Sequence, residues 1–165
     1  MKRAILILMI LGWLPAMVAA ETQKRGDVTN LPLPRFVSLK SSEANARRGP
    51  SLSHRIDWVY KQKHMPLEIF GEYENWRRVR DAEGFGGWIH YSLLSGSRTV
   101  LITAPLQDIF AKPDPNSMVV AKFSRDVVAE LGKCTLQWCQ VKADGNKGWA
   151  PKDALWGVYP HEIRE

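Results

Sequence analysis

Beyond its first twenty residues, the chain lacks any apolar run long enough to cross a bilayer as a helix, which takes about 20 residues. It also has few metal-binding side chains, with two cysteines and four histidines among 165 residues. No histidine forms a His-x-x-x-His pair, and no cysteines form a Cys-x-x-Cys pair. The sequence therefore predicts no metal site and no cofactor.

The one long apolar run lies at the N-terminus. Lys2 and Arg3 precede the apolar residues 4–14, and small residues end the segment at Ala20. This pattern predicts a signal peptide that is cleaved near Ala20, so that the mature protein is periplasmic or secreted. An uncleaved membrane anchor is the alternative, but Pro15 interrupts the apolar run and leaves it short for a span.

The positive charge is modest once this segment is removed. Cleavage would take away Lys2 and Arg3 and lower the formal net charge of +6 by two. Basic and acidic side chains are intermixed along the rest of the chain, as on a solvated surface. A nucleic-acid site needs a basic stripe with little acid, so we expect no nucleic-acid partner.

Two stretches of the mature chain repeat each other. Trp76 is followed by the step Gly87-Trp88, and Trp138 is followed by the step Gly148-Trp149. Short apolar runs separated by turn-forming residues surround both pairs, which is typical of an all-β protein. A unit of about 60 residues is marginal for an independent core. We therefore expect the two units to pack together or to depend on a disulfide.

Cys134 and Cys139 are the only cysteines, and they lie in the second unit. An even number of cysteines in an exported protein favours a bond between them. The four intervening residues suit a hairpin loop, whereas on one straight strand the two side chains would point to opposite faces. The sequence predicts a local disulfide rather than a redox or metal site.

Several short motifs follow one another in a fixed order. They are Asn45-Ala46-Arg47-Arg48-Gly49-Pro50, Asp57-Trp58-Val59-Tyr60, Trp76-Arg77-Arg78-Val79, Gly87-Trp88-Ile89-His90, Leu93-Leu94-Ser95-Gly96 and Leu155-Trp156-Gly157-Val158-Tyr159-Pro160. The first resembles the opening motif of bacterial SH3-like (SH3b) domains. The set as a whole resembles the exported tandem SH3-like proteins of Gram-negative bacteria, over about residues 36–160.

This resemblance implies two tandem SH3-like barrels of five or six strands each, with a binding or targeting role and no defined ligand. The second unit has Asp108 and Phe110 where the motif has asparagine and arginine, so no arginine-dependent ligand contact is carried over to it. The expected organisation is a signal peptide at 1–20, a flexible lead at 21–35 and SH3-like domains at 36–98 and 99–165.

The aromatic residues suggest both a core and a binding surface. Trp88 and Trp149 are expected in the core, because the preceding glycines allow close backbone packing, while Trp76 and Trp138 could belong to the core or to a groove wall. Aromatic faces bind flat apolar groups and arginines hold carboxylates. The hypothetical ligand surface therefore lies mainly in the first unit, at Arg47, Trp58, Tyr60, Trp76, Arg77 and Tyr91.

Three functions are compatible with this pattern. The first is a non-catalytic exported module that recognises peptidoglycan or an envelope peptide. The second is a scaffold that packs on another envelope protein, which an exposed apolar patch would favour. The third is an accessory part of a cell-wall hydrolase system. We expect no catalytic residue, because a cysteine hydrolase needs a thiolate beside a histidine. The two cysteines lie far in sequence from every histidine and are expected to pair with each other, and two small barrels leave no residues for a catalytic domain.

Overall fold

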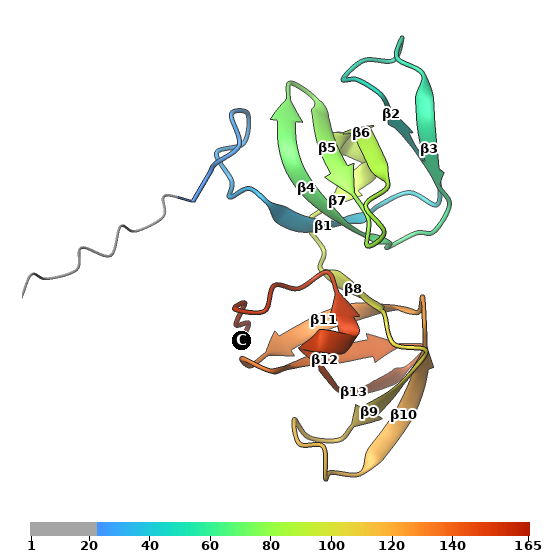
Figure 1. The fold of residues 1–165 in the computed structure, drawn as a ribbon, viewed down its shortest axis with the longest axis vertical. Helices are drawn as coiled ribbons and strands as arrows, with labels where there is room; N and C mark the ends of the chain where they lie inside the picture. Colours follow the sequence, from blue (N-terminus) through green and yellow to red (C-terminus); the bar gives the residue numbers. More distant parts are fainter. Residues whose placement is uncertain (1–22) are drawn as a thin grey trace, which may run out of the picture.

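The structure, a computed structural model, describes residues 23–165 and consists of two β domains (Figure 1). The predicted signal peptide at residues 1–20 lies outside the described residues. No helix within residues 23–165 is long and apolar enough to cross a membrane. The prediction of an all-β protein with two tandem domains is confirmed.

Seven strands form the first domain, with a short 3-10 helix η1 before the last. They are β1 (Arg35–Leu39), β2 (Ala44–Arg47), β3 (Ile56–Tyr60), β4 (Pro66–Tyr73), β5 (Trp76–Arg80), β6 (Gly86–His90), η1 (Tyr91–Leu93) and β7 (Leu94–Ser95). They form one sheet in the order β3-β2-β6-β5-β4-β1-β7. The sheet surrounds a core of buried side chains that includes Leu39, Leu67, Ile69 and Ile89.

The second domain repeats this plan element by element. It contains β8 (Thr99–Ile102), β9 (Leu106–Phe110), β10 (Val119–Ser124), β11 (Val128–Cys134), β12 (Trp138–Ala143), β13 (Asn146–Pro151), η2 (Lys152–Ala154) and β14 (Leu155–Trp156). The strand order β10-β9-β13-β12-β11-β8-β14 is that of the first domain, shifted by seven strands. The repeat seen in the sequence is therefore a duplication of the whole domain fold.

The Gly-Trp steps begin the same close contact in both domains. A Cβ atom at Gly87 would lie 2.6 Å from the carbonyl oxygen of Arg47, and one at Gly148 would lie 2.7 Å from that of Phe110. The glycines thus allow β6 to approach β2, and β13 to approach β9, as expected. Trp88 and Trp149 themselves are only half-buried, so the expectation that they fill the core is wrong.

The buried positions are one residue later, at Ile89 and Ala150, both of which are fully buried. Successive side chains of a strand point to opposite faces. The residue after each Gly-Trp step therefore enters the core, and the tryptophan lies on the outer face of the sheet.

The segment that precedes the first domain, for which the sequence suggested a flexible lead at 21–35, makes specific contacts with that domain. Arg25 and Pro32 form an isolated β-bridge, and Leu33 is buried in the first core. The backbone N–H and the hydroxyl of Thr29 donate hydrogen bonds of 2.9 and 2.7 Å to the carboxylate of Glu72. Thr29 and Leu33 thus attach this segment to the first domain, and Figure 1 shows it as a loop to one side of the sheet.

Glu72 is the anchor for this segment, and it also accepts a 2.6 Å hydrogen bond from Arg35. Burial raises the pKa of Glu72, but the hydrogen bonds from Thr29 and Arg35 outweigh burial and lower it to about 2. The carboxylate is therefore ionised in the folded protein at neutral pH.

The two domains pack directly against each other. The ring of Phe36 lies edge-on to Trp156, with 5.1 Å between centroids, and 4.6 Å from the ring of Tyr159. The hydroxyl of Thr99 donates a 2.7 Å hydrogen bond to the backbone carbonyl of His64. The expectation that two marginal units pack together agrees with these contacts.

Candidate functional site

The structure divides the six predicted ligand-binding residues between separate places. Trp58 and Tyr60 lie on β3, where Trp58 is 38% exposed and stacks on Phe85 with 4.6 Å between centroids. Tyr60 is buried, and its hydroxyl donates a 2.8 Å hydrogen bond to the carbonyl oxygen of Phe85. Trp58 and Tyr60 line a shallow cleft of about 290 Å³ that Leu101 of the second domain also lines.

Arg47 and Trp76 line a different and smaller pocket of about 180 Å³. Nη1 of Arg47 donates hydrogen bonds of 3.0 and 2.7 Å to the carbonyl oxygens of Leu52 and His54. Arg47 thus holds the loop between β2 and β3. Trp76 is buried and packs edge-on against His90, so it belongs mostly to the domain interior.

Arg77 is 7% exposed and is held by its own domain. Its Nη1 atom donates hydrogen bonds of 2.8 and 2.9 Å to the carbonyl oxygens of Glu74 and Trp76, and its Nε lies 3.7 Å from the carboxylate of Glu72. Tyr91 is exposed, and the Arg77 guanidinium lies 5.8 Å from its ring centroid. In this arrangement Arg77 supports β5 and Tyr91 rather than presenting a free cation to a ligand.

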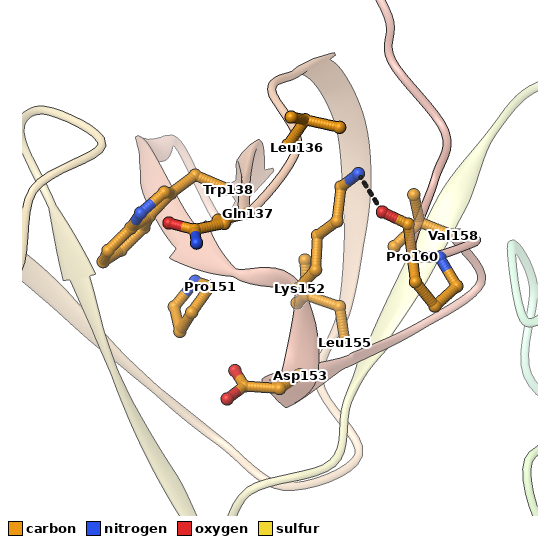
Figure 2. Close-up of a pocket in the computed structure, with 9 residues that line it drawn as sticks. All are labelled: Leu136, Gln137, Trp138, Pro151, Lys152, Asp153, Leu155, Val158 and Pro160. Atoms are coloured by element: carbon orange, nitrogen blue, oxygen red, sulfur yellow. Dashed lines mark hydrogen bonds between the residues drawn. The ribbon is translucent and has the colours of Figure 1, made fainter. Parts of the chain in front are cut away.

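A larger pocket, of about 570 Å³, lies in the second domain (Figure 2). Most of its wall is apolar, as is typical of sites for small molecules and peptide segments. It is lined by Leu136, Gln137, Trp138, Pro151, Lys152, Asp153, Leu155, Val158 and Pro160.

The disulfide loop builds one side of this pocket. Cys134 and Cys139 are bonded to each other and face each other across β11 and β12, as predicted. Thr135 N–H donates a 2.8 Å hydrogen bond to the carbonyl oxygen of Trp138, whose own N–H donates to the Thr135 hydroxyl at 3.1 Å. The tight loop that results presents Leu136, which is 66% exposed, and the half-buried Trp138 to the pocket.

Lys152 forms the other side and fixes the segment after β14. Its Nζ atom donates hydrogen bonds to the carbonyl oxygens of Pro160, at 3.1 Å, and Glu162. Figure 2 shows the aliphatic stem of Lys152 crossing the pocket toward Pro160. Burial lowers the pKa of Lys152, and the nearby Glu162 opposes that shift. The Lys152 ammonium is therefore engaged in hydrogen bonds within the domain and is not free to bind a ligand.

The segment after β14 is held by further contacts. Glu162 accepts hydrogen bonds of 2.8 and 3.0 Å from the two terminal nitrogens of Arg98. Arg164 pairs with Cys134 through two backbone hydrogen bonds of 2.8 and 3.0 Å. These contacts attach the segment to the disulfide hairpin and give the pocket a defined wall.

Asp153 supplies the other charged side chain of the pocket. It is exposed and makes no side-chain hydrogen bond or ion pair within the part of the chain that the structure describes. Figure 2 shows its carboxylate at the edge of the pocket beside Pro151. The pocket thus combines an apolar, aromatic wall with one exposed negative charge.

This pocket was not predicted from the sequence, because the ligand surface was expected in the first unit. Two features of the sequence pointed toward this pocket. One is the disulfide loop, and the other is Trp138, for which both the core and a groove wall were considered. Trp76 and Trp138 occupy equivalent positions on β5 and β12, yet only Trp76 is buried. The fold-back of residues 158–164, which closes the pocket, had no local sequence signal.

Comparison with known proteins gives a family match and distant structural likenesses. The sequence profile described as "Bacterial SH3 domain" matches residues 40–96 and residues 104–157. No curated protein matches the chain in sequence.

Solved structures with a partial likeness include NlpC1 and NlpC2 from Trichomonas vaginalis, each 15% identical with a TM-score of 0.35. The alignments cover 87% and 74% of this chain and 50% and 48% of those chains, respectively. An NlpC/P60 family protein from Bacillus cereus is 14% identical with a TM-score of 0.33, over 73% of this chain and 55% of that one. The chain thus spans about half the length of these proteins.

Proposed function

Because the chain belongs to the bacterial SH3 domain family and carries two such domains in tandem, we propose that it is a non-catalytic binding protein of the cell envelope that recognises peptidoglycan or an envelope peptide. The observation that carries this proposal is the pocket beside Trp138. It offers an apolar wall, an exposed leucine and one carboxylate, and its volume of about 570 Å³ accommodates a short peptide segment.

The cysteines support an extracytoplasmic location. Cys134 and Cys139 form a disulfide, and structural disulfides persist mainly in oxidising compartments outside the cytoplasm. This agrees with the N-terminal pattern that predicts a cleaved signal peptide. The mature protein, from residue 21 onward, is therefore proposed to act in the periplasm or outside the cell.

The state of the cysteines also supports a role without catalysis. Both cysteines form the disulfide, so neither is available as the thiolate nucleophile that a cysteine hydrolase needs. A zymogram with cell-wall substrate tests this directly. We expect no clearing by the purified mature protein, and clearing that is lost on mutation of one of its own residues would show that it is an enzyme.

Sedimentation with purified insoluble peptidoglycan tests the binding proposal. Leu136→Ser removes the exposed leucine of the disulfide loop, and Leu106→Ser is the matched control, because Leu106 is 59% exposed in the same domain without lining the pocket. We expect the wild type and Leu106→Ser to sediment with peptidoglycan and Leu136→Ser to remain largely in solution. Equal sedimentation of both variants would contradict a binding role for this pocket.

A scaffold role is the second candidate, favoured by an apolar surface on the first domain. Strand β3 lies at one end of its sheet and exposes Ile56, Trp58 and Val59. Phe85, which stacks on Trp58, is exposed as well. Edge strands and exposed apolar patches of this kind are common protein interaction sites. Crosslinking in intact cells tests this role, since a specific protein adduct through Val59 would support it.

The third possibility, an accessory role in a cell-wall hydrolase system, is compatible with the same binding activity. It predicts that the mature protein accelerates digestion of peptidoglycan by a separate hydrolase. An unchanged digestion rate would contradict the accessory role and leave the binding proposal unaffected.

A further inference from the structure

One charged side chain in the pocket beside Trp138 forms no ion pair with the described residues. This charge indicates which kind of ligand the pocket binds. The carboxylate of Asp153 is exposed at the pocket edge and has no partner within residues 23–165. The neighbouring ammonium of Lys152 keeps its charge, but Lys152 is buried and its Nζ donates to the carbonyl oxygens of Pro160 and Glu162. The charged group of the pocket that a ligand can reach is therefore the carboxylate of Asp153.

The groups around this carboxylate suit the aliphatic part of a ligand. Figure 2 shows Pro151 between Asp153 and the indole of Trp138, with Leu155 on the other side of Asp153. Methylene groups attached to an ammonium are compatible with such a surface, and the indole face also attracts a cation. A chain of a few methylenes that ends in an amine would satisfy both the apolar wall and the carboxylate.

We propose that the pocket beside Trp138 selects a peptide that carries a free primary amine, with the amine paired to Asp153 and its aliphatic stem against Pro151 and Trp138. This inference rests on the proposed function and names the ligand group as an un-cross-linked amine of the peptide chains of peptidoglycan. Un-cross-linked chains keep this amine charged, whereas a cross-link through the amine converts it to a neutral amide.

The first domain lacks the equivalent charge. The helix η1 corresponds to η2, so that Tyr91 and Ser92 occupy the positions of Lys152 and Asp153. The Ser92 hydroxyl lies 2.8 Å from Nδ1 of His90 and is thus already engaged. A carboxylate at this position of the 3-10 helix is therefore a feature of the second domain alone.

The test compares native peptidoglycan with peptidoglycan whose free amines have been acetylated with acetic anhydride. We expect acetylation to weaken sedimentation of the wild-type mature protein about fivefold, the size of one partly exposed ion pair of about 1 kcal/mol. Asp153→Asn is expected to show the same loss on native peptidoglycan. It should lose nothing further on acetylated peptidoglycan, because the interaction is already absent.

The matched control is Asp144→Asn. Asp144 is exposed in the turn between β12 and β13, at the far end of these strands from the pocket, and its positive φ of 49° is one that asparagine tolerates. This variant is expected to behave as the wild type on both preparations.

The possible failures are distinguishable. Equal sedimentation of the wild type with native and acetylated peptidoglycan would overturn amine selection and leave the proposed binding function intact. No sedimentation with either preparation would overturn both. The variant Asp153→Asn could also sediment less than the wild type by the same factor on acetylated as on native peptidoglycan. This result would overturn the pairing of Asp153 with the amine.

Discussion

The hydroxyl of Tyr159, in the second domain, donates a 2.9 Å hydrogen bond to Oε1 of Glu68, in the first. Glu68 is buried on β4, and its other carboxylate oxygen accepts a hydrogen bond from Arg80. Burial raises the pKa of Tyr159, and the hydrogen bond to Glu68 raises it further. Tyr159 is therefore a neutral donor that joins the two domains through a buried carboxylate.

Tyr159→Phe is expected to weaken this junction. The substitution keeps the ring that packs on Phe36 and removes only the hydroxyl, which leaves one oxygen of a buried carboxylate without its donor. We expect the free energy of unfolding to fall by about 2 kcal/mol, as for other hydrogen bonds to charged groups. Urea denaturation measures the change. Tyr73→Phe, at an exposed tyrosine, is the control and should change stability little.

The pKa of Glu72 predicts how stability depends on acid. It is about 2 in the folded protein, below the usual 4.5, so the folded state favours the ionised carboxylate. The stabilisation is complete above about pH 5 and is lost as the pH falls through the window between 4.5 and 2. Glu72→Gln is expected to be less stable by about 2 kcal/mol at pH 7, because Thr29 and Arg35 lose a charged acceptor.

Denaturant unfolding at a series of pH values measures this dependence. The stability of Glu72→Gln should fall less steeply than that of the wild type between pH 5 and 2. Parallel curves for the two proteins would show that Glu72 is not the group responsible.

The disulfide is expected to stabilise the second domain and its pocket. In the chain-entropy model, a loop as small as that between Cys134 and Cys139 gains about 2 kcal/mol, so the double variant Cys134→Ser/Cys139→Ser should lose about that much. Loss of the constraint also loosens Leu136 and Trp138, so we expect weaker sedimentation with peptidoglycan. Maleimide labelling checks the premise, because two reactive thiols in the unreduced native protein would contradict the bond.

Gly148 offers a test of the close contact that the two domains share. A Cβ atom there would lie 2.6 Å from Cγ2 of Ile109 and 2.7 Å from the carbonyl oxygen of Phe110. Gly148→Ala is therefore expected to destabilise the protein by about 1–3 kcal/mol, as overpacking in other cores does. Gly96→Ala is the control, since no atom lies within 4 Å of the added Cβ. Equal thermal unfolding of the two variants would contradict the contact.

The sequence was sufficient to predict the duplicated β units because their signals are local. The Trp76/Trp138 spacing, the glycines of the Gly-Trp steps and the cysteine pair each depend on strands and turns close in the chain. The burial of Trp88 and Trp149 was predicted incorrectly, because a shift of one residue along a strand exchanges the inner and outer faces. A composition rich in aromatic residues does not by itself determine that register.

Other features depend on contacts between residues far apart in sequence. Glu72 holds Thr29 from 43 residues away, and Arg98 holds Glu162 from 64 residues away. Glu72, Arg98 and Glu162 each resemble an ordinary surface charge until the fold brings the partners together. This is why the lead was expected to be flexible, and why the wall of the pocket, which is built by residues 158–164, was not foreseen.

Two tryptophan variants decide which domain carries the recognition surface. Trp138 lines the pocket beside Asp153, whereas Trp58 stacks on Phe85 in the first domain. Trp138→Ala is expected to weaken sedimentation with peptidoglycan by about thirtyfold, as for an aromatic anchor worth about 2 kcal/mol. Trp58→Ala removes an aromatic residue that is also partly exposed and should sediment as the wild type does.

Circular dichroism and thermal unfolding establish that both variants remain folded before binding is compared. The opposite result, with sedimentation lost only for Trp58→Ala, would place the surface in the first domain, where the sequence had placed it. The two outcomes also differ in their dependence on the disulfide. Binding through Trp138 should weaken on reduction, because Cys134 and Cys139 close the loop that presents this side chain, whereas binding through Trp58 should be unaffected.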